Sequence, residues 1–198
     1  MEALNDSLFL LINASSSPPP AVLVAARALA EGVIWLIPLG LVWGWLRGSR
    51  DLRATLLRAA LAGLIALGAN QLIGLVWYHP RPFEIGLGHA WLVHSRDSSF
   101  PSDHVTLLWS VALGLALRRH TRTAGMTLGL AGIAVAWARI YLGVHFPFDM
   151  AGAAVVAVAA VAVASSVPTP AIDSLLRALS TAHRVLFAPL IARGWVKP

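Results

Sequence analysis

Residues 124–149 read AGMTLGLAGIAVAWARIYLGVHFPFD, an apolar run that ends in an Arg, a His and an Asp. The apolar part has about the length of roughly 20 residues that a helix needs to cross a bilayer. Arg139, His145 and Asp149 therefore lie inside or beside a hydrophobic span, where a charged side chain costs roughly 2.5 to 3.5 kcal/mol on insertion scales. A cluster of such residues indicates a functional site.

The spacing within this cluster favours chemistry at the imidazole. His145 and Asp149 are four residues apart, so on a helical turn the carboxylate can accept a hydrogen bond from one ring nitrogen. The other ring nitrogen is then free to act as a nucleophile or a base. Arg139 offers a planar, permanently charged group suited to a phosphate or a carboxylate. Taken singly, each residue also has a structural explanation, such as a helix cap or an Arg that extends toward lipid headgroups.

The composition indicates an integral membrane protein. Of the 198 residues, 58% are hydrophobic and only 12% are charged, against roughly 25% charged in an ordinary soluble domain. The apolar runs are continuous rather than alternating, which predicts helices and not a barrel. The absence of Cys excludes disulfides and Cys-based zinc sites. Glu2 and Asp6 stand where a signal peptide would be basic, so no cleavable signal is expected.

We predict an all-α polytopic membrane bundle that forms one domain over residues 1–198. About five spans are expected, at approximately 21–45, 55–77, 104–117, 124–144 and 148–167. The short apolar run Leu8–Ile12 predicts an interfacial helix at the N-terminus. The tail, about 170–190, also predicts an interfacial helix, because a further span there would bury Arg177 and Arg184.

The basic residues predict the orientation of this bundle. Eleven of the fifteen Lys and Arg lie on one side, namely Arg47, Arg50, Arg53, Arg58, Arg118, Arg119, Arg122, Arg177, Arg184, Arg193 and Lys197. The positive-inside rule makes that side cytoplasmic, with the N-terminus outside and the tail inside. The other four, Arg27, Arg81, Arg96 and Arg139, lie at or near the opposite surface. The net charge of +6 thus reflects topology rather than nucleic-acid binding.

Two further polar motifs fall on the predicted outer side. His79–Phe83, with the sequence HPRPF, ends the second span, and Ser98–His104, with the sequence SSFPSDH, begins the third. Ser102 is the expected N-cap of the third span, with Asp103 in its first turn. The free backbone N–H groups at such a start form an anion site. Helix capping alone would also account for Pro-Ser-Asp, and a helix stop for Arg-Pro.

With these motifs the chain resembles the type 2 phosphatidic acid phosphatase superfamily, whose patterns are K-x6-R-P, P-S-G-H and S-R-x5-H-x3-D. The matching residues are Arg81, Pro82, Pro101, Ser102, His104, Arg139, His145 and Asp149. Three positions depart from the patterns: Gly74 replaces the Lys, Asp103 the Gly and Ala138 the Ser. Within the superfamily, the sequences HPRPF and DSSFPSDH are most similar to those of bacterial undecaprenyl-diphosphate phosphatases of the bacitracin-resistance type.

The resemblance implies a covalent mechanism centred on one histidine. His145 is expected to attack phosphorus and form a phosphohistidine, while Asp149 holds its tautomer and stabilises the developing cation. His104 is expected to protonate the leaving oxygen and later to activate water. No cofactor and no metal are expected.

The resemblance also implies the residues that bind the phosphate. Arg81, Arg139 and Ser102, with the start of the third span, are expected to hold the phosphoryl oxygens. Asp103 lies in the same stretch and is counted among the phosphate-binding candidates. Because a carboxylate repels phosphate, its alternatives are to point into the helix start or to orient a histidine.

Other polar residues are weaker candidates. Arg27 and Glu31 are four apart in the first span, which predicts a buried ion pair that supports the site; contact of Glu31 with substrate is the alternative. His79, His89 and His94 lack metal-ligand spacing, so we expect them at the pocket rim or in solvent.

The predicted function is hydrolysis of undecaprenyl diphosphate at the outer face of the cytoplasmic membrane, which recycles carrier lipid for envelope polymers such as peptidoglycan. The expected partners are this polyprenyl diphosphate and membrane lipids, without nucleic acid; no oligomeric state is predicted. One alternative is a phosphatase for phosphatidate or phosphatidylglycerophosphate. A non-enzyme alternative is a lipid-phosphate flippase, which should show internal repeats or broken helices, and neither is predicted here.

Overall fold

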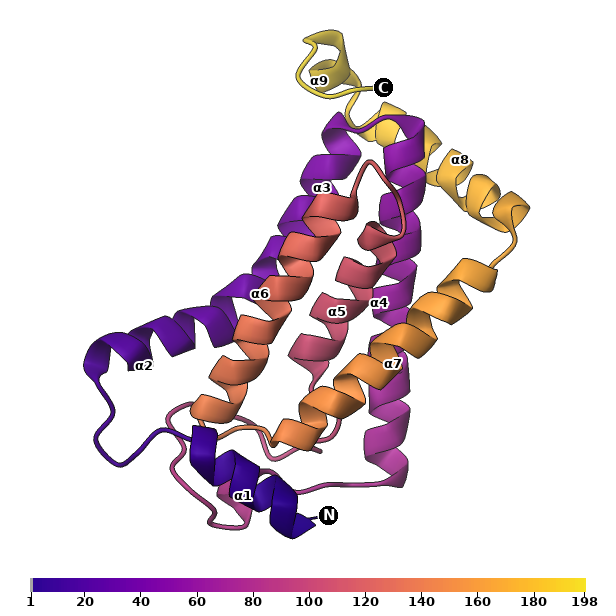
Figure 1. Ribbon diagram of the computed structural model, residues 1–198. Helices are drawn as coiled ribbons and strands as arrows, with labels where there is room; N and C mark the ends of the chain where they lie inside the picture. The colour runs from indigo at the N-terminus through magenta and orange to yellow at the C-terminus, as the bar shows by residue number, and fades with distance from the viewer. Residues whose placement is uncertain (1) are drawn as a thin grey trace.

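The computed structural model describes residues 2–198, and over that range it contains helices and no strands (Figure 1). The α-helices are α1 (Glu2–Ile12), α2 (Pro20–Arg27), α3 (Leu36–Arg47), α4 (Arg50–Val76), α5 (Asp103–Ala116), α6 (Arg122–Tyr141), α7 (Pro147–Ser166), α8 (Thr169–Leu186) and α9 (Ala188–Ala192). The predicted all-α membrane bundle is confirmed.

Helices α4 to α7 form the centre of the bundle, and α5 packs against α4, α6 and α7. Small residues let these helices approach closely, as is usual for helices that pack within a membrane. A Cβ atom at Gly125 of α6 would lie 2.5 Å from the backbone nitrogen of Ala116 in α5. One at Gly114 of α5 would lie 3.0 Å from Cα of Ala59 in α4. The central helix is therefore held in near backbone contact with its neighbours.

Four helical segments are long and apolar enough to cross a membrane: Pro20–Arg47, Arg50–Val76, Arg122–Tyr141 and Pro147–Ser166. The predicted third span corresponds to α5, which has only 14 residues. At 1.5 Å per residue it is about 21 Å long, shorter than the roughly 30 Å hydrocarbon layer. Because α5 lies among other helices, its ends need not match the bilayer.

The first span is helical from Pro20 to Arg47 but bends in its middle. Between α2 and α3 the chain forms a π turn, Ala28–Gly32, and a 3-10 turn, Val33–Trp35. Figure 1 shows α2 projecting away from the bundle at an angle to α3. Pro38 gives a physical reason, because a proline ring clashes with the carbonyl four residues earlier and donates no hydrogen bond to it.

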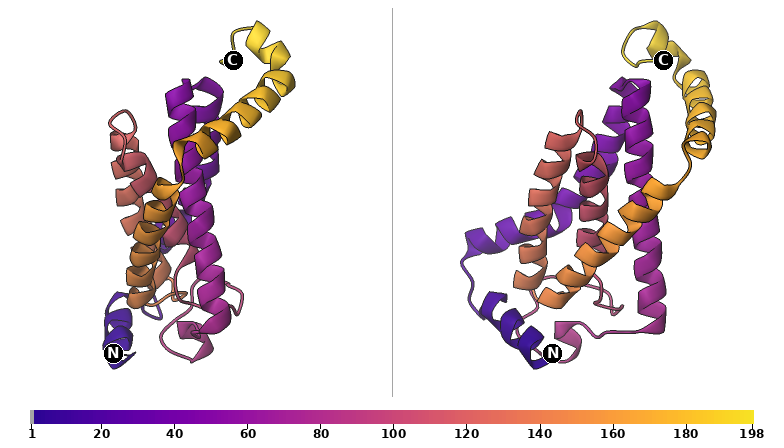
Figure 2. Two further views of the ribbon diagram at one scale, coloured as in Figure 1. Left: turned by 90° about the vertical axis from the view of Figure 1, so that its right-hand side faces the viewer. Right: turned by 45° about the vertical axis from the view of Figure 1, so that its right-hand side comes forward.

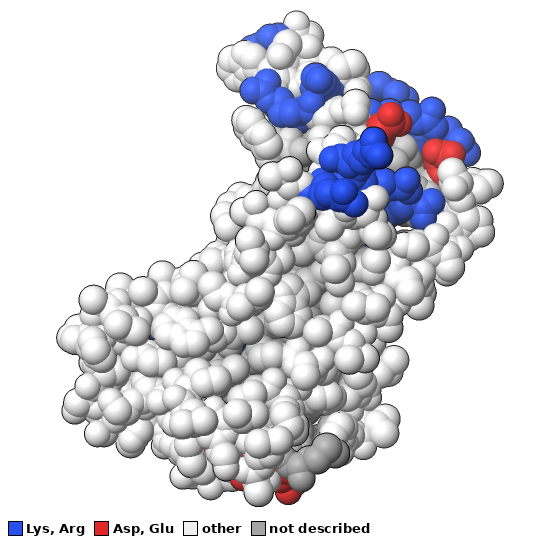
Figure 3. Space-filling view, viewed as in Figure 1, with Lys and Arg blue, Asp and Glu red and all other residues white. Residues whose placement is uncertain are grey.

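The two termini lie at opposite ends of the bundle (Figure 2). Figure 3 shows Lys and Arg side chains gathered at the end that carries α8 and α9. Helix α8 buries Ile172 and Leu176, and it is not among the segments apolar enough to span. The separation of charge along the molecule matches the distribution in sequence; the side of the membrane that each end faces stays a prediction.

A loop over residues 77–102 covers the end of the bundle opposite to α8. The side chain of Asn13 donates hydrogen bonds to the carbonyls of His89 and Tyr141, at 2.9 and 3.1 Å. The backbone of Trp91 donates to the carbonyl of Leu142 at 2.9 Å. These contacts fasten the loop against the turn between α6 and α7, which contains His145.

Candidate active site

The turn between α6 and α7 presents His145, which is only 1% exposed. Its Nδ1 lies 3.1 Å from Oδ2 of Asp149, in the first turn of α7. The same carboxylate oxygen accepts a hydrogen bond from the backbone N–H of Phe146 at 2.8 Å, which caps the helix start. An ionised carboxylate only accepts, so it assigns the ring proton to Nδ1 and leaves the Nε2 lone pair available.

Two buried guanidinium groups face that lone pair. NH1 of Arg81 lies 3.1 Å from Nε2 of His145, and NH2 of Arg139 lies 3.4 Å from it. Arg81 is held in place by the carbonyls of Val144 and Ser98, at 2.7 and 3.3 Å. Burial, followed by the positive charges of Arg139 and Arg81, holds the pKa of His145 well below its ordinary value. The imidazole is therefore neutral near pH 7, as a nucleophile must be.

The second motif lies beside this cluster at the start of α5. Ser102 is the N-cap residue of α5 and is fully buried. Its hydroxyl makes no hydrogen bond among residues 2–198, and the same holds for the buried Nε of Arg139. His104, in the first turn of α5, is half-buried and lies within the electrostatic range of Arg139 and Arg81. The three motifs thus come together at one end of the bundle.

Asp103 is turned toward α4. Its two carboxylate oxygens accept hydrogen bonds from the side-chain amides of Asn70 and Gln71, at 2.8 and 3.2 Å. Asn70 also donates to the hydroxyl of Thr106 at 3.1 Å. Amide donors on α4 therefore hold the carboxylate, which explains how an acidic residue is tolerated next to a phosphate-binding motif.

The loop contributes three residues to the cluster for which the sequence predicted no role in the site. The Ser99 hydroxyl donates to Oδ2 of Asp149. Oδ1 of Asp97 accepts a hydrogen bond from Nε of Arg81 at 2.9 Å and forms an ion pair with NH2 of Arg81 at 2.8 Å. Nε2 of His94, a residue expected at the rim or in solvent, lies 2.8 Å from NH2 of Arg139. Ser99 lies within the Ser98–His104 motif but was given no role there, whereas His94 and Asp97 lie outside the motifs; the signal in the sequence is the polar run from 94 to 99.

The positive charge of Arg81 keeps Asp97 ionised. Burial by itself would raise the pKa of Asp97, but the charge and hydrogen bonds of Arg81 outweigh it and lower the pKa below its ordinary value. Burial and the charge of Arg81 also lower the pKa of His94. A neutral His94 can accept a hydrogen bond from Arg139, so acceptors from one loop engage both guanidinium groups.

The predicted pair of Arg27 and Glu31 does not form. Both residues are exposed, and no ion pair joins them among residues 2–198. The reason is that Nε and NH2 of Arg27 donate to the carbonyl of Trp91, at 3.2 and 2.9 Å. Arg27 therefore binds the loop instead of its own helix.

The departures from the motifs have local explanations. A Cβ atom at Gly74 would lie 3.2 Å from Cβ of Ser98, so a longer side chain there would meet the loop. Ala138 is fully buried against Ala26 and Ala30. Within residues 2–198, no group of three His, Asp or Glu side chains is arranged to hold a metal ion.

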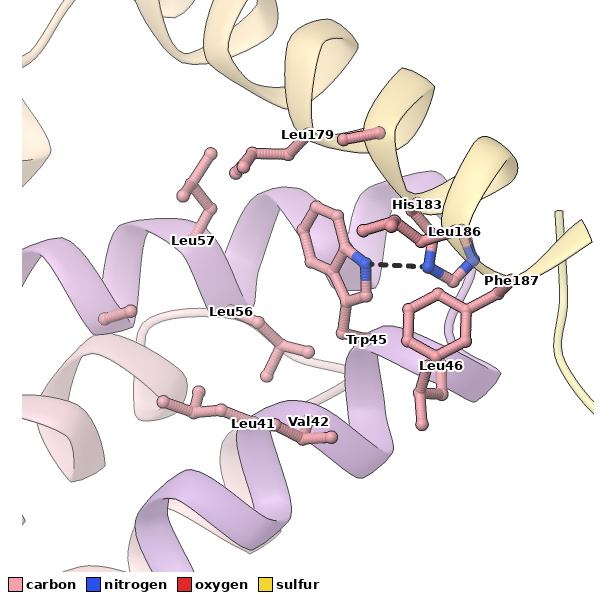
Figure 4. Close-up of a pocket in the computed structure, with 12 residues that line it drawn as sticks. Leu41, Val42, Trp45, Leu46, Leu56, Leu57, Leu179, His183, Leu186 and Phe187 are labelled. Carbon is pink, nitrogen blue, oxygen red and sulfur yellow. Dashed lines mark hydrogen bonds between the residues drawn. The ribbon is translucent and has the colours of Figure 1, made fainter.

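A separate apolar groove of about 420 Å³ lies at the basic end, between α3, α4 and α8 (Figure 4). His183 is its one ionisable lining residue. The Nδ1 atom of His183 accepts from the indole N–H of Trp45 at 3.3 Å, and Nε2 lies 2.9 Å from the carbonyl of Lys197. Both ring nitrogens of His183 are thus engaged, and the groove lies at the end of the molecule opposite to His145.

A neutral imidazole backed by a carboxylate and faced by two guanidinium groups is a candidate phosphoryl-transfer site at one end of a membrane bundle. Residues 54–172 match the PAP2 superfamily, and the chain belongs to that family. It is a multi-pass membrane enzyme of the phosphatase class.

Relatives cover most or all of the chain. It is 35% identical over 197 residues to YbjG of Escherichia coli (strain K12), a protein provisionally named an undecaprenyl-diphosphatase, and the match covers 100% of this chain and 99% of that protein. It is 38% identical over 114 residues to undecaprenyl-diphosphatase BcrC of Bacillus subtilis (strain 168), covering 58% of each. A Bacillus licheniformis BcrC, named a bacitracin transport permease protein, is 34% identical over 131 residues, or 66% of this chain and 64% of that protein.

Two solved structures share the fold. The crystal structure of Aquifex aeolicus LpxE has a TM-score of 0.67 at 22% identity, over 81% of this chain and 94% of that one. The PAP2-type phosphatidylglycerolphosphate phosphatase from Bacillus subtilis has a TM-score of 0.58 at 19% identity, over 83% and 84%. At these identities the likeness concerns the fold alone.

Proposed function

We propose that this chain hydrolyses undecaprenyl diphosphate to undecaprenyl phosphate and phosphate at the outer face of the cytoplasmic membrane. The names of YbjG and BcrC support this choice of lipid, since one match covers the whole chain. The phosphatase centre lies at the end opposite to the basic residues, which supports an outward-facing site under the positive-inside rule. The product would return as a carrier lipid for envelope polymer synthesis.

One observation carries the proposal. The unprotonated Nε2 of His145 lies within hydrogen-bond distance of Arg81 and Arg139, while two buried donors, the Ser102 hydroxyl and Nε of Arg139, have no partner among residues 2–198. An unpaired buried donor costs about 1–3 kcal/mol. Phosphoryl oxygens in front of Nε2 would satisfy these donors and neutralise the two guanidinium charges.

In the first chemical step, Nε2 of His145 bonds to the terminal phosphorus and the bond to the bridging oxygen breaks. Asp149 accepts the Nδ1 hydrogen bond and stabilises the positive charge that develops on the imidazole. Arg81 and Arg139 stabilise the equatorial phosphoryl oxygens in a poorly solvated site. The lipid monophosphate leaves with the electron pair of the broken bond.

In the second step, water attacks the phosphohistidine and inorganic phosphate leaves. His104 is the general acid for the first step and the general base for the second, and such a group contributes about 10²- to 10⁴-fold. Its half-buried place at the start of α5 keeps it beside the arginines but open to water.

Phosphate release from purified protein in detergent tests the function. Undecaprenyl diphosphate, phosphatidate and phosphatidylglycerophosphate should be assayed side by side, and we expect the highest kcat/KM with the diphosphate. The permease name of one relative makes a flippase the second candidate function. In detergent there are no compartments, so a flippase would release no phosphate from any of the three lipids.

We expect activity to persist in EDTA. The proposed phosphate ligands are guanidinium groups, and the described residues offer no carboxylate cluster for a hard cation. Phosphate release should be measured before and after chelation, with a matched sample to which Mg²⁺ is returned. Loss of all activity in EDTA, restored by Mg²⁺, would contradict this mechanism.

A further inference from the structure

A cavity of about 480 Å³ lies beside the catalytic cluster. The loop over residues 77–102 forms most of its wall, and Arg27 of α2 closes it from the first span. Phe83, Trp91 and Leu92 give it apolar surfaces, while Arg27 and Arg96 give it charge. The mechanism above uses none of these five residues.

One imidazole connects this cavity to the nucleophile. His94 lines the cavity, and its Nε2 lies 2.8 Å from NH2 of Arg139. The ring of His94 is also 6.2 Å from the ring of His145, centroid to centroid. A group bound in the cavity therefore lies next to a phosphoryl group held in front of His145.

Two arginines line the cavity, and the nearby carboxylate of Asp97 lies 3.6 Å from His94 but is paired with Arg81. No carboxylate is among its lining residues. Arg27 uses Nε and NH2 on the carbonyl of Trp91, so its NH1 has no hydrogen-bond partner within residues 2–198. Arg96 makes no hydrogen bond or ion pair to the described part of the chain. Both guanidinium groups thus have N–H donors free for an anion, and arginine is well suited to phosphate.

The arginines that lie away from the basic end are concentrated around the site and the cavity. Only four of the fifteen Lys and Arg are absent from the basic end of the molecule. Two of them, Arg81 and Arg139, face His145; the other two, Arg27 and Arg96, line the cavity. The positive-inside rule disfavours basic residues at the outer surface, and all four of these arginines lie either beside His145 or in the wall of the cavity.

We propose that the cavity binds the non-transferred phosphate of the lipid diphosphate, between Arg27 and Arg96, with the first carbons of the chain against Phe83, Trp91 and Leu92. This inference rests on the proposed function. The substrate then places one phosphate in each of two adjacent arginine pairs.

Arg27 and Arg96 would contribute to catalysis because the leaving group becomes more negatively charged during the reaction. When the bond between the terminal phosphorus and the bridging oxygen breaks, that oxygen keeps the electron pair, and the departing lipid monophosphate gains negative charge. Arg27 and Arg96 stabilise this charge as it develops. A phosphomonoester has no second phosphate and makes no such contact.

The test compares two substrates in the same variants. Arg27→Gln, Arg96→Gln and the double variant are purified in detergent, with Arg119→Gln at the basic end as the matched control. Values of kcat/KM are measured for undecaprenyl diphosphate and for para-nitrophenyl phosphate. We expect each single change to lower kcat/KM for the diphosphate about 10-fold and the double change about 100-fold, which corresponds to charged hydrogen bonds. Activity on the monoester should be unchanged and serves as the control for folding.

Each other outcome overturns the inference. Equal losses on both substrates would give the arginines a structural or general headgroup role, and full diphosphate activity in the double variant would show that no second phosphate binds there. A wild-type enzyme that hydrolyses only the monoester would instead refute the proposed function, and the inference with it. The wild-type rates on the two substrates test the proposed function, and the ratio of variant to wild-type kcat/KM on each substrate tests the second phosphate site.

Discussion

At the scale of single residues, the site depends on keeping one buried histidine neutral and correctly oriented. Asp149 accepts the hydrogen bond from Nδ1–H of His145, while Arg81 and Arg139 face its Nε2 atom. Two positive charges beside an imidazole disfavour its protonation, and the same charges attract the phosphate. The arrangement thus uses one pair of arginines for both purposes.

The lowered pKa of His145 can be measured directly. Its folded pKa lies below the ordinary 6.5, so folding favours the neutral ring, and the free energy of unfolding should fall as pH falls from about 6.5 toward the folded pKa. We expect the ¹³Cε1 NMR signal of His145 to titrate below pH 6.5 in detergent, and Arg81→Gln to move that titration upward. Arg119→Gln is the control; a His145 signal that already titrates above pH 6.5 would contradict the electrostatic argument.

The two histidines of the proposed mechanism should differ in their response to substitution. His145→Ala should abolish turnover and phosphoenzyme with every substrate, because no other group forms the intermediate. His104→Ala should lose about 10²- to 10⁴-fold on a lipid phosphomonoester, whose leaving group needs a proton, and less in the first step with a diphosphate or an aryl phosphate. The variant should then accumulate phosphohistidine, since hydrolysis still needs His104.

Single-turnover rates and acid-labile phosphate, measured in both variants, check these roles. Phosphate trapped by His145→Ala would remove that residue as the nucleophile. Equal losses on all substrates in His104→Ala, without phosphoenzyme, would remove the acid and base role.

At the scale of elements, the turn between α6 and α7 places the nucleophile only because Gly143 allows it. Gly143 has φ +80°, and a Cβ atom there would lie 2.2 Å from the carbonyl oxygen of His89. The turn and the 77–102 loop are thus in backbone contact. A side chain at position 143 must displace one of them, and both carry residues of the site.

Gly143→Ala should therefore lower kcat/KM at least about 10-fold, since a displacement near 1 Å can cost about 10² in rate. Gly86→Ala is the matched control, because Gly86 has φ +71° but nothing within 4 Å of its would-be Cβ atom. Both variants carry the strain of about 1–2 kcal/mol of a left-handed residue, yet only Gly143→Ala meets the loop. Equal activity of the two variants would show that the contact does not position His145.

The bend in the first span also affects the loop that covers the site. Because α2 turns away from α3, Arg27 reaches the carbonyl of Trp91 and closes the cavity beside His94. The π turn at Ala28–Gly32 changes the α-helical spacing on which the predicted pair of Arg27 and Glu31 depended. Arg27 therefore bonds to the loop and not to a residue of its own helix.

At the scale of the whole molecule, charge is separated from one end to the other. The basic residues gather around α8 and α9, and the catalytic cluster lies at the opposite end (Figures 1 and 3). This polarity suits an enzyme that takes a lipid headgroup from one leaflet while its other end faces anionic lipid.

The orientation can be tested with single cysteines, since the chain has none of its own. Val93→Cys lies in the loop at a fully exposed position, and Arg119→Cys lies at the basic end. An impermeant thiol reagent should label only the first in intact cells and both after permeabilisation. Labelling of Arg119→Cys alone in intact cells would reverse the proposed topology.

The sequence alone determined the helical membrane class, because bilayer length and continuous apolar runs are local properties. It also specified the three motifs, because their residues are close along the chain. It did not predict the roles of His94, Asp97 and Ser99, which reach the site only when a long polar loop folds over the bundle.

Tertiary structure alone decided which partner each charged group has. Asp103 binds amides of α4, and Arg27 binds a loop carbonyl in place of Glu31. These pairings join residues 32, 33 and 64 positions apart. Sequence spacing describes neighbours on one helix, whereas a polar group in a membrane protein takes the partner that the fold brings near it, since an unpaired one is costly.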